Sequence, residues 1–217
     1  MDWREVVARE EERYRDGMAR LPVDDPDARQ KQLTRMGNAA YGAGLALLME
    51  GDEEDARAWF TRAVERYGES FADAPPGSWG RTIGAMKARV LAGNWDWAAD
   101  AARWTLEEEA GKAESPIGKY AACLALLILG RDREARMYAD DLRTHEGFPT
   151  DVADTLAMLT AQDVVGYSEA VEDVLESFET RDEYLEAVPV ADTVLVLQAL
   201  AGRREMAAEL SSPLLPE

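Results

Sequence analysis

Histidine and cysteine are almost absent from this sequence, and the shortage excludes several kinds of site. A single histidine, His145, is too few for a multi-histidine zinc centre or for the paired Glu-x-x-His motifs of di-iron bundles. A single cysteine, Cys123, cannot form a disulfide within the chain, which is typical of a cytoplasmic protein. Because Cys123 lies in an apolar run, we expect its thiol to be buried and inert.

Long apolar runs are also missing. The longest, Tyr120 to Leu129, is much shorter than the ~20 residues that a membrane-spanning helix needs. Charged residues interrupt the first part of the chain, where a secretory leader requires an unbroken apolar segment. We therefore expect a cytoplasmic protein that does not associate with a membrane.

Basic residues are few relative to acids, and the formal net charge is −19. The imbalance is strongest in residues 148–217, which contain 15 acids and 3 bases. The negative electrostatic field of these acids disfavours binding to nucleic-acid phosphates or to an anionic membrane, and it favours a basic protein partner. Only 4 of the 24 basic residues are lysine, a composition also typical of a halophilic protein. Adaptation to salt is therefore an alternative explanation for the acidity.

Apolar residues recur at intervals of three and four residues, which predicts helices along the chain and no strand. From Ser78 to Leu106 this pattern describes two amphipathic helices joined by a turn at Gly93-Asn94. The predicted helices, about 11 in number, span residues 2–20, 26–50, 53–72, 78–92, 95–111, 115–129, 132–146, 150–163, 167–178, 189–201 and 203–211.

A glycine followed five residues later by an alanine recurs at nearly constant spacing. Glycine can adopt the positive φ of a turn between helices, and the small alanine lets the paired helices approach closely. The successive alanines are 42, 37, 35 and 37 residues apart, counting one weaker copy. The copies are Gly51/Ala56, Gly93/Ala98, Gly130/Ala135, the weaker Gly166/Ala170, and Gly202/Ala207.

This periodicity predicts an all-α fold of antiparallel helix hairpins stacked as a short α-solenoid. We assign residues 1–217 to a single helical-repeat domain. Its parts are an N-terminal helix and connection at 1–36, about five hairpin units at 37–211, and a tail at 212–217.

One unit resembles the tetratricopeptide repeat, a helix pair of about 34 residues. Gly44, Ala56, Phe60 and Ala63 occupy the family's small, small, aromatic and small positions with its spacing of 12, 4 and 3. The later units are tetratricopeptide-like only, because they carry other residues at these places. The departures include Met86 and Thr105 in one unit, and Cys123 and Leu142 in the next.

A second resemblance covers Tyr41 to Leu142. Trp79-Gly80-Arg81-x-Ile83-Gly84-x-x-Lys87-Ala88, followed by Gly93 and by Ala98-Ala-x-Ala-Ala-Arg103-Trp104, is similar to the immunity protein 49 family. Members of that family are assigned to polymorphic-toxin systems. The resemblance implies that this chain neutralises a cognate toxin by binding it.

Motifs for catalysis are missing. The sequence has no phosphate-binding glycine loop, no dinucleotide fingerprint and no nucleophile elbow. Asp140-Asp141 is followed by no second aspartate at the spacing of the aspartate-rich metal motifs. We therefore expect no catalytic residue, no metal site and no cofactor.

Tryptophans concentrate near the middle of the chain. We expect Trp97 and Trp104 to be core residues, and Trp79 and Trp95, at a helix start and a turn, to be partly exposed. An exposed tryptophan beside an arginine is typical of an interface hot spot. The first helices of successive hairpins would contribute further side chains to a concave surface. The candidate partner-binding residues are Trp79, Arg81, Lys87, Trp95, Lys119 and Tyr120.

The sequence therefore favours a non-catalytic protein-binding module, whose most concrete form is an immunity protein with its acidic last third facing a basic toxin. One alternative is a metal-dependent enzyme that acts on a small molecule and binds the metal through Asp140 and Asp141. Another is a structural protein that assembles with copies of itself through Leu210 to Leu215.

Overall fold

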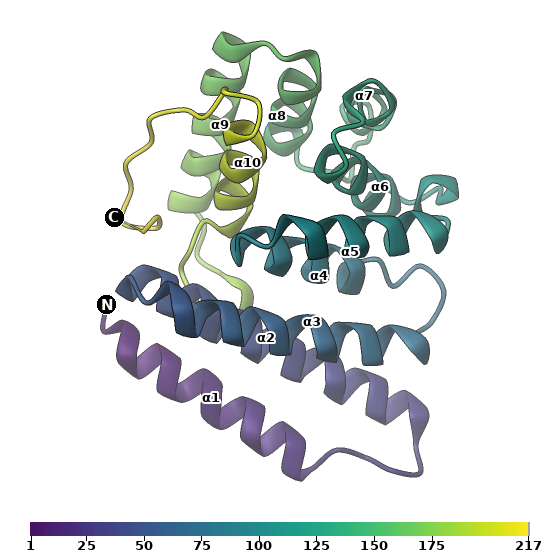
Figure 1. Ribbon diagram of the computed structural model, residues 1–217, viewed down its shortest axis with the longest axis vertical. Helices are drawn as coiled ribbons and strands as arrows, with labels where there is room; N and C mark the ends of the chain where they lie inside the picture. Colours follow the sequence, from purple (N-terminus) through teal and green to yellow (C-terminus); the bar gives the residue numbers. More distant parts are fainter. Residues whose placement is uncertain (217) are drawn as a thin grey trace. The chain divides into compact units, whose positions relative to one another are not determined.

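A computed structural model describes residues 1–216 of the chain. These residues form ten α-helices and two short 3₁₀-helices and contain no strand, which confirms the all-α prediction (Figure 1). The α-helices are α1 (Trp3–Ala19), α2 (Pro26–Glu50), α3 (Glu53–Ala72), α4 (Gly80–Leu91), α5 (Trp95–Glu107), α6 (Pro116–Ile128), α7 (Asp132–Leu142), α8 (Thr150–Ala161), α9 (Val164–Glu179) and α10 (Asp192–Gly202). The 3₁₀-helices are η1 (Ala110–Lys112) and η2 (Leu185–Ala187).

The chain divides into two compact units. Unit 1 contains Met1–Asn94, Asp182–Val190 and the C-terminal residues from Leu215, and unit 2 contains Trp95–Arg181 and Ala191–Leu214. The short stretch between α9 and α10 therefore belongs to unit 1. The single domain predicted for residues 1–217 stays a prediction.

Capping side chains and a left-handed glycine set the boundaries of α2 and the start of α3, which the sequence predicted closely. At the start of α2, the Asp25 carboxylate accepts the Ala28 N–H at 2.9 Å, and Pro26 occupies the first turn. Gly51 ends α2 with a left-handed φ of 81°. Asp52 then caps α3 by accepting the Asp55 N–H at 3.2 Å.

The helix predicted for residues 203–211 is wrong, and the structure has ten α-helices in its described part rather than about 11. After α10 the chain turns at Glu205, whose φ is 58°, and continues without helical structure. The Ala208 backbone instead exchanges two hydrogen bonds with the Gln198 side chain of α10, at 2.6 and 3.1 Å. The pair Gly202/Ala207 therefore does not mark a hairpin.

The turn between α8 and α9 also differs from the expected pattern. Gln162, not Gly166, ends α8 in the left-handed region, with a φ of 57°. Gly166 lies in the first turn of α9, where an added Cβ would be 2.7 Å from the Met158 sulfur. A side chain here would displace the Met158 or Asp163 side chain, so Gly166 contributes to the close packing of the two helices and not to the turn.

Close helix contacts in unit 1 depend on glycines facing aromatic rings. A Cβ on Gly44 of α2 would lie 2.7 Å from Phe60 of α3. A Cβ on Gly37 of α2 or on Gly84 of α4 would lie equally close to the Tyr67 ring of α3. Each glycine thus leaves the space that a ring fills, which fixes how closely α2, α3 and α4 pack.

Unit 2 is built on α6, which is buried along most of its length. Its Cys123 thiol is fully buried, as expected, and contacts the Ala135 carbonyl of α7 at 3.5 Å. Burial raises the pKa of this thiol well above its usual range. Ala135 is fully buried too, so the α6–α7 hairpin closes over a small residue.

Arg204 fixes the chain after α10 within unit 2. Its guanidinium donates to the Leu127 carbonyl of α6 at 2.8 Å and to the Leu200 carbonyl of α10 at 2.9 Å. It also forms a mostly buried ion pair with Asp132 at the start of α7. Burial raises the pKa of Asp132, but the hydrogen bonds from Arg204 and Gln162 and the nearby positive charge outweigh it, so the pKa lies below its ordinary value of 3.8.

Replacing Gly44 by alanine should test the contact with Phe60. Alanine normally stabilises a helix relative to glycine, but here the added methyl group overlaps the ring, and we expect a loss of about 2 kcal/mol. The matched control is Gly68→Ala in α3, where nothing lies within 4 Å of the added Cβ. That variant should gain about 0.5–1 kcal/mol in unfolding free energy measured with urea.

Asp132→Asn should destabilise the fold by about 3 kcal/mol near neutral pH, because Arg204 loses its buried counter-charge. The folded-state pKa of Asp132 is below the unfolded value near 3.8, so the ion pair contributes fully above that pH and is lost as pH falls through the folded-state pKa. Urea unfolding should therefore show a constant difference between wild type and variant from pH 7 to about 5, then a shrinking one. Asp140→Asn, which removes one partner of an exposed ion pair with Arg136, is the control and should change stability by less than about 0.5 kcal/mol at pH 7.

Candidate functional site

The six candidate partner-binding residues are divided equally between the two units, and two of them are buried. The Trp79 side chain, expected to be partly exposed, is only 8% exposed and packs against Phe71 with ring centroids 6.3 Å apart. Tyr120 is buried against Phe148 of unit 2, and this burial raises the pKa of its hydroxyl. The predicted exposure of Trp79 is therefore wrong, and both rings present little surface to a partner.

Arg81 holds the helices of unit 1 together. It donates from Nε to the Ser70 hydroxyl of α3 at 2.7 Å and from Nη2 to the Gln30 side chain of α2. The Ser70 hydroxyl in turn donates to the backbone carbonyl of Gln30 at 2.7 Å. Partial burial lowers the pKa of Arg81. Lys87, further along α4, is half-buried.

The candidates in unit 2 contact neighbouring side chains. The Arg203 guanidinium lies 4.4 Å from the centre of the Trp95 ring, a cation–π contact. The Lys119 ammonium contacts the Asp141 carboxylate at 2.5 Å and the His145 Nε2 at 3.0 Å. This lysine, carboxylate and imidazole come from α6, α7 and the turn after α7, so only the tertiary structure brings them together.

Asp140 and Asp141, the two acids proposed for a metal site, form ion pairs with different basic residues. Asp140 pairs with Arg136 at 3.5 Å, and Asp141 pairs with Lys119. Within residues 1–216, no three histidine, cysteine or acidic side chains converge in a way that could hold a metal ion. Asp140 and Asp141 therefore do not make a shared site.

Trp97 was expected in the core, and that prediction is wrong because its side chain is 50% exposed. Trp97, Asp100, Trp104 and Glu107 follow each other at three- and four-residue intervals, so they share one face of α5. We call these four residues the Trp97 stripe. The buried residues of α5 are Ala98, Ala101, Ala102 and Thr105.

A surface pocket of about 530 Å³ begins where the Trp97 stripe ends. Glu107 belongs both to the stripe and to the pocket lining, which comes from α5, η1, α6 and α7. Apolar lining is contributed by Leu106, Leu126 and Met137, the last of which is 74% exposed. Charged residues at the pocket are Glu107, Glu109, Lys112, Arg131 and Glu134.

A row of exposed acids follows one side of α9 in unit 2. No lysine or arginine occurs in this helix, and its buried face consists of apolar residues and Tyr167. Two exposed valines, Val164 and Val165, precede the row. The exposed acids are Glu169, Glu172, Asp173, Glu176 and Glu179.

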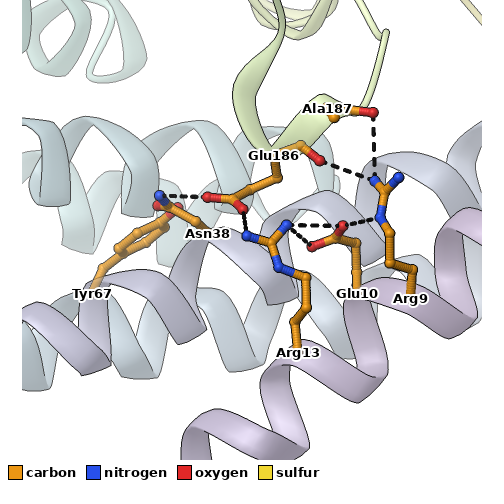
Figure 2. A network of polar contacts seen from close by, with 7 residues as sticks. All are labelled: Arg9, Glu10, Arg13, Asn38, Tyr67, Glu186 and Ala187. Carbon is orange, nitrogen blue, oxygen red and sulfur yellow. Dashed lines mark hydrogen bonds and ion pairs between the residues drawn. The ribbon is translucent and has the colours of Figure 1, made fainter.

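Unit 1 contains a polar network around a carboxylate that is completely buried (Figure 2). Glu10 of α1 contacts Arg9 at 2.7 Å and Arg13 at 3.1 Å. Burial lowers the pKa of Arg13, but the charges of Glu10 and Glu186 outweigh it and raise the pKa above its ordinary value. The two arginines thus supply the charge compensation that a buried carboxylate requires.

Glu186, from η2, completes this network. Its carboxylate forms an ion pair with Arg13 and accepts the Asn38 amide N–H at 3.2 Å. The Tyr67 hydroxyl donates to the Asn38 carbonyl oxygen at 3.0 Å, which turns the amide N–H toward Glu186. Arg9 donates to the backbone carbonyls of Glu186 and Ala187 at 3.0 and 3.4 Å. Figure 2 shows these groups converging on η2.

The backbone of η2 has an uncommon conformation. Both Glu186 and Ala187 are left-handed, with φ values of 54° and 55°. A left-handed non-glycine residue costs about 1 kcal/mol or more, because its Cβ crowds the following carbonyl. The contacts from Arg9, Arg13 and Asn38 must offset this cost in the folded protein.

Sequence reasoning missed this network entirely. No sequence pattern singled out Glu10 or Arg13, and Glu186 lies more than 140 residues from Asn38. The only local indication that Glu10 is buried was the apolar residue Val6, which lies four positions earlier on the same helical face. No spacing rule links residues so far apart in the chain.

Comparisons with protein-family models, with curated proteins and with solved structures find no match for this chain. Within the described residues, every helix is too short or too polar to cross a bilayer. The resemblances to tetratricopeptide repeats and to the immunity protein 49 family therefore stay predictions.

Glu10→Gln should lower the free energy of unfolding by about 2–3 kcal/mol, because Arg9 and Arg13 would face each other without the buried negative charge. Glu12→Gln, on the exposed side of the same helix, is the matched control and should change stability by less than about 0.5 kcal/mol. Urea unfolding followed by circular dichroism measures both. Equal effects of the two variants would contradict the assigned role of Glu10.

Proposed function

We propose that this protein is a non-catalytic protein-binding module, and the observation that carries the proposal is the half-exposed Trp97 on α5. Tryptophan contributes more to protein interfaces than almost any other residue, because its large ring fills pockets on a partner. Trp104 lies on the same stripe, and the carboxylate of Asp100 lies between them in sequence. Trp104 itself is partly buried, so the half-exposed Trp97 is the residue that favours contact with another macromolecule.

The pocket next to the stripe supports the same surface. Glu107 belongs both to the Trp97 stripe and to the lining, so the apolar pocket residues Leu106 and Met137 lie near the end of the stripe. Long basic side chains suit this combination, because their methylene groups pack on apolar atoms while the charge meets carboxylates. We infer a partner that presents lysine or arginine beside apolar side chains.

The charge of the chain supports a basic partner as well. The net charge is −19, and α9 presents acids without a basic residue in the helix. Opposite charges speed the encounter of two proteins and help to select the correct partner. In the most concrete form of this proposal the partner is a basic toxin, and the protein is a cytoplasmic immunity protein related to the immunity protein 49 family.

Helix pairs of the tetratricopeptide type are the proposed scaffold. The contact between Gly44 and Phe60 in the α2–α3 pair supports this assignment, since small and aromatic residues hold these two places in the family's pattern. The α6–α7 pair supports it less directly, through Gly130 with a φ of 70° and the buried Ala135. Stacked pairs of this kind typically expose extended surfaces for binding.

Capture from the native host should test the proposal. Immobilised wild-type protein, in lysate at the salt concentration of the host cytoplasm, should retain one basic protein in stoichiometric amount. Trp97→Ala should weaken binding of the purified partner by at least tenfold in calorimetry, because removal of a hot-spot tryptophan costs about 2 kcal/mol. The affinity of wild type should also fall as salt is added.

Met18→Ala is the matched control, because Met18 is 49% exposed and lies in unit 1 on α1. It should bind the partner as wild type does. Failure to recover a stoichiometric partner, or equal binding by Trp97→Ala and wild type, would reject the proposed surface. A toxin-like product of the neighbouring gene, inhibited on mixing, would identify the immunity function.

A further inference from the structure

Residues 182–190 lie on unit 1 in the way that a bound peptide would. We call them the 182–190 segment, and they are separated in sequence from the rest of unit 1 on both sides. Val188 and Val190 are buried, whereas Leu185 is 53% exposed. Val188 packs over α2 at Gly42, where an added Cβ would be 3.3 Å from the valine and 3.4 Å from the methylene carbon of Glu10.

Polar recognition of the segment uses both its side chain and its backbone. Arg13 and Asn38 bind the Glu186 carboxylate, and Arg9 binds the carbonyls of Glu186 and Ala187. Tyr67 holds the Asn38 amide in the orientation that donates to the carboxylate. A charged side-chain contact combined with backbone contacts and a buried apolar residue is the usual basis of peptide recognition.

The contacts of the 182–190 segment also allow it to detach from the rest of unit 1 as a whole. The backbone hydrogen bonds within it are local, from Ala187 to Tyr184, from Val188 to Leu185 and from Val190 to Val188. Opening would therefore break side-chain contacts but no α-helix, and Glu186 and Ala187 of η2 could relax from their left-handed conformations. Segments held in this way open at a smaller free energy than the surrounding core.

We infer that Arg9, Arg13 and Asn38 form a carboxylate-binding site on unit 1, and that the 182–190 segment is its releasable peptide ligand. When the segment leaves, two guanidinium groups remain beside the single buried carboxylate of Glu10. This local excess of positive charge contrasts with the net charge of the chain, −19. It selects a peptide that carries a carboxylate, as the segment itself does.

Hydrogen exchange in the full-length protein tests whether the segment opens by itself. Glu186→Gln removes the charge that Arg13 binds and should raise exchange of the Ala187, Val188 and Val190 amides at least tenfold, while α1, α2 and α3 keep their protection within twofold. Glu183→Gln, on an exposed residue of the same segment, is the control and should change nothing. Equal loss of protection in the segment and in the three helices would overturn the inference, as would no change in the segment.

Binding in trans tests the site. A fluorescent peptide of residues 182–190 should bind the Glu186→Gln protein, measured by anisotropy, at least tenfold more tightly than wild type, whose site holds its own segment. A peptide with glutamine at 186 and a protein with the additional change Arg13→Gln should each lose at least tenfold in affinity. Binding that ignores both changes, or no binding to Glu186→Gln protein that melts as a folded chain, would reject the site. Neither assay involves Trp97, so the result is independent of the proposed partner surface.

Discussion

The fit of the Tyr67 ring between two glycines is the constraint on which unit 1 depends. Gly37 of α2 and Gly84 of α4 both lack the Cβ that would overlap this ring. The three helices therefore meet around one side chain, and the position of its hydroxyl is fixed by packing. Because that hydroxyl orients Asn38, the same steric fit determines where a carboxylate can bind on unit 1.

Arginine performs most of the internal charge compensation in this acidic protein. Arg9 and Arg13 surround a buried glutamate, Arg81 joins three helices, and Arg204 binds two carbonyls and an aspartate. The planar guanidinium donates several hydrogen bonds in fixed directions, which lysine cannot do. The preference for arginine over lysine thus has a structural reason besides adaptation to salt. Many acids remain on the surface, including the row on α9.

Three of the residues that composition suggested for partner binding have structural roles in the fold. Trp79, Arg81 and Tyr120 support the helices by packing or hydrogen bonding, whereas Trp97 presents half of its surface to solvent. An amphipathic pattern locates the buried stripe of a helix only when its neighbours are known. On α5 the buried face consists of small residues, so alanine and threonine occupy the inside and tryptophan remains outside.

The sequence alone determined most helices, because caps such as Asp25 and Asp52 and the left-handed Gly51 act within a few residues. It also singled out Gly44 and Phe60 by their spacing, and the structure brings these two residues into contact. Only the tertiary structure decided the conformation of residues 203–211, where the Gln198 side chain hydrogen-bonds to the backbone and no helix forms. It likewise decided which tryptophan is exposed and how Glu186 meets Arg13 and Asn38. Those outcomes depend on side chains far apart in sequence, whose approach is set by packing and not by local periodicity.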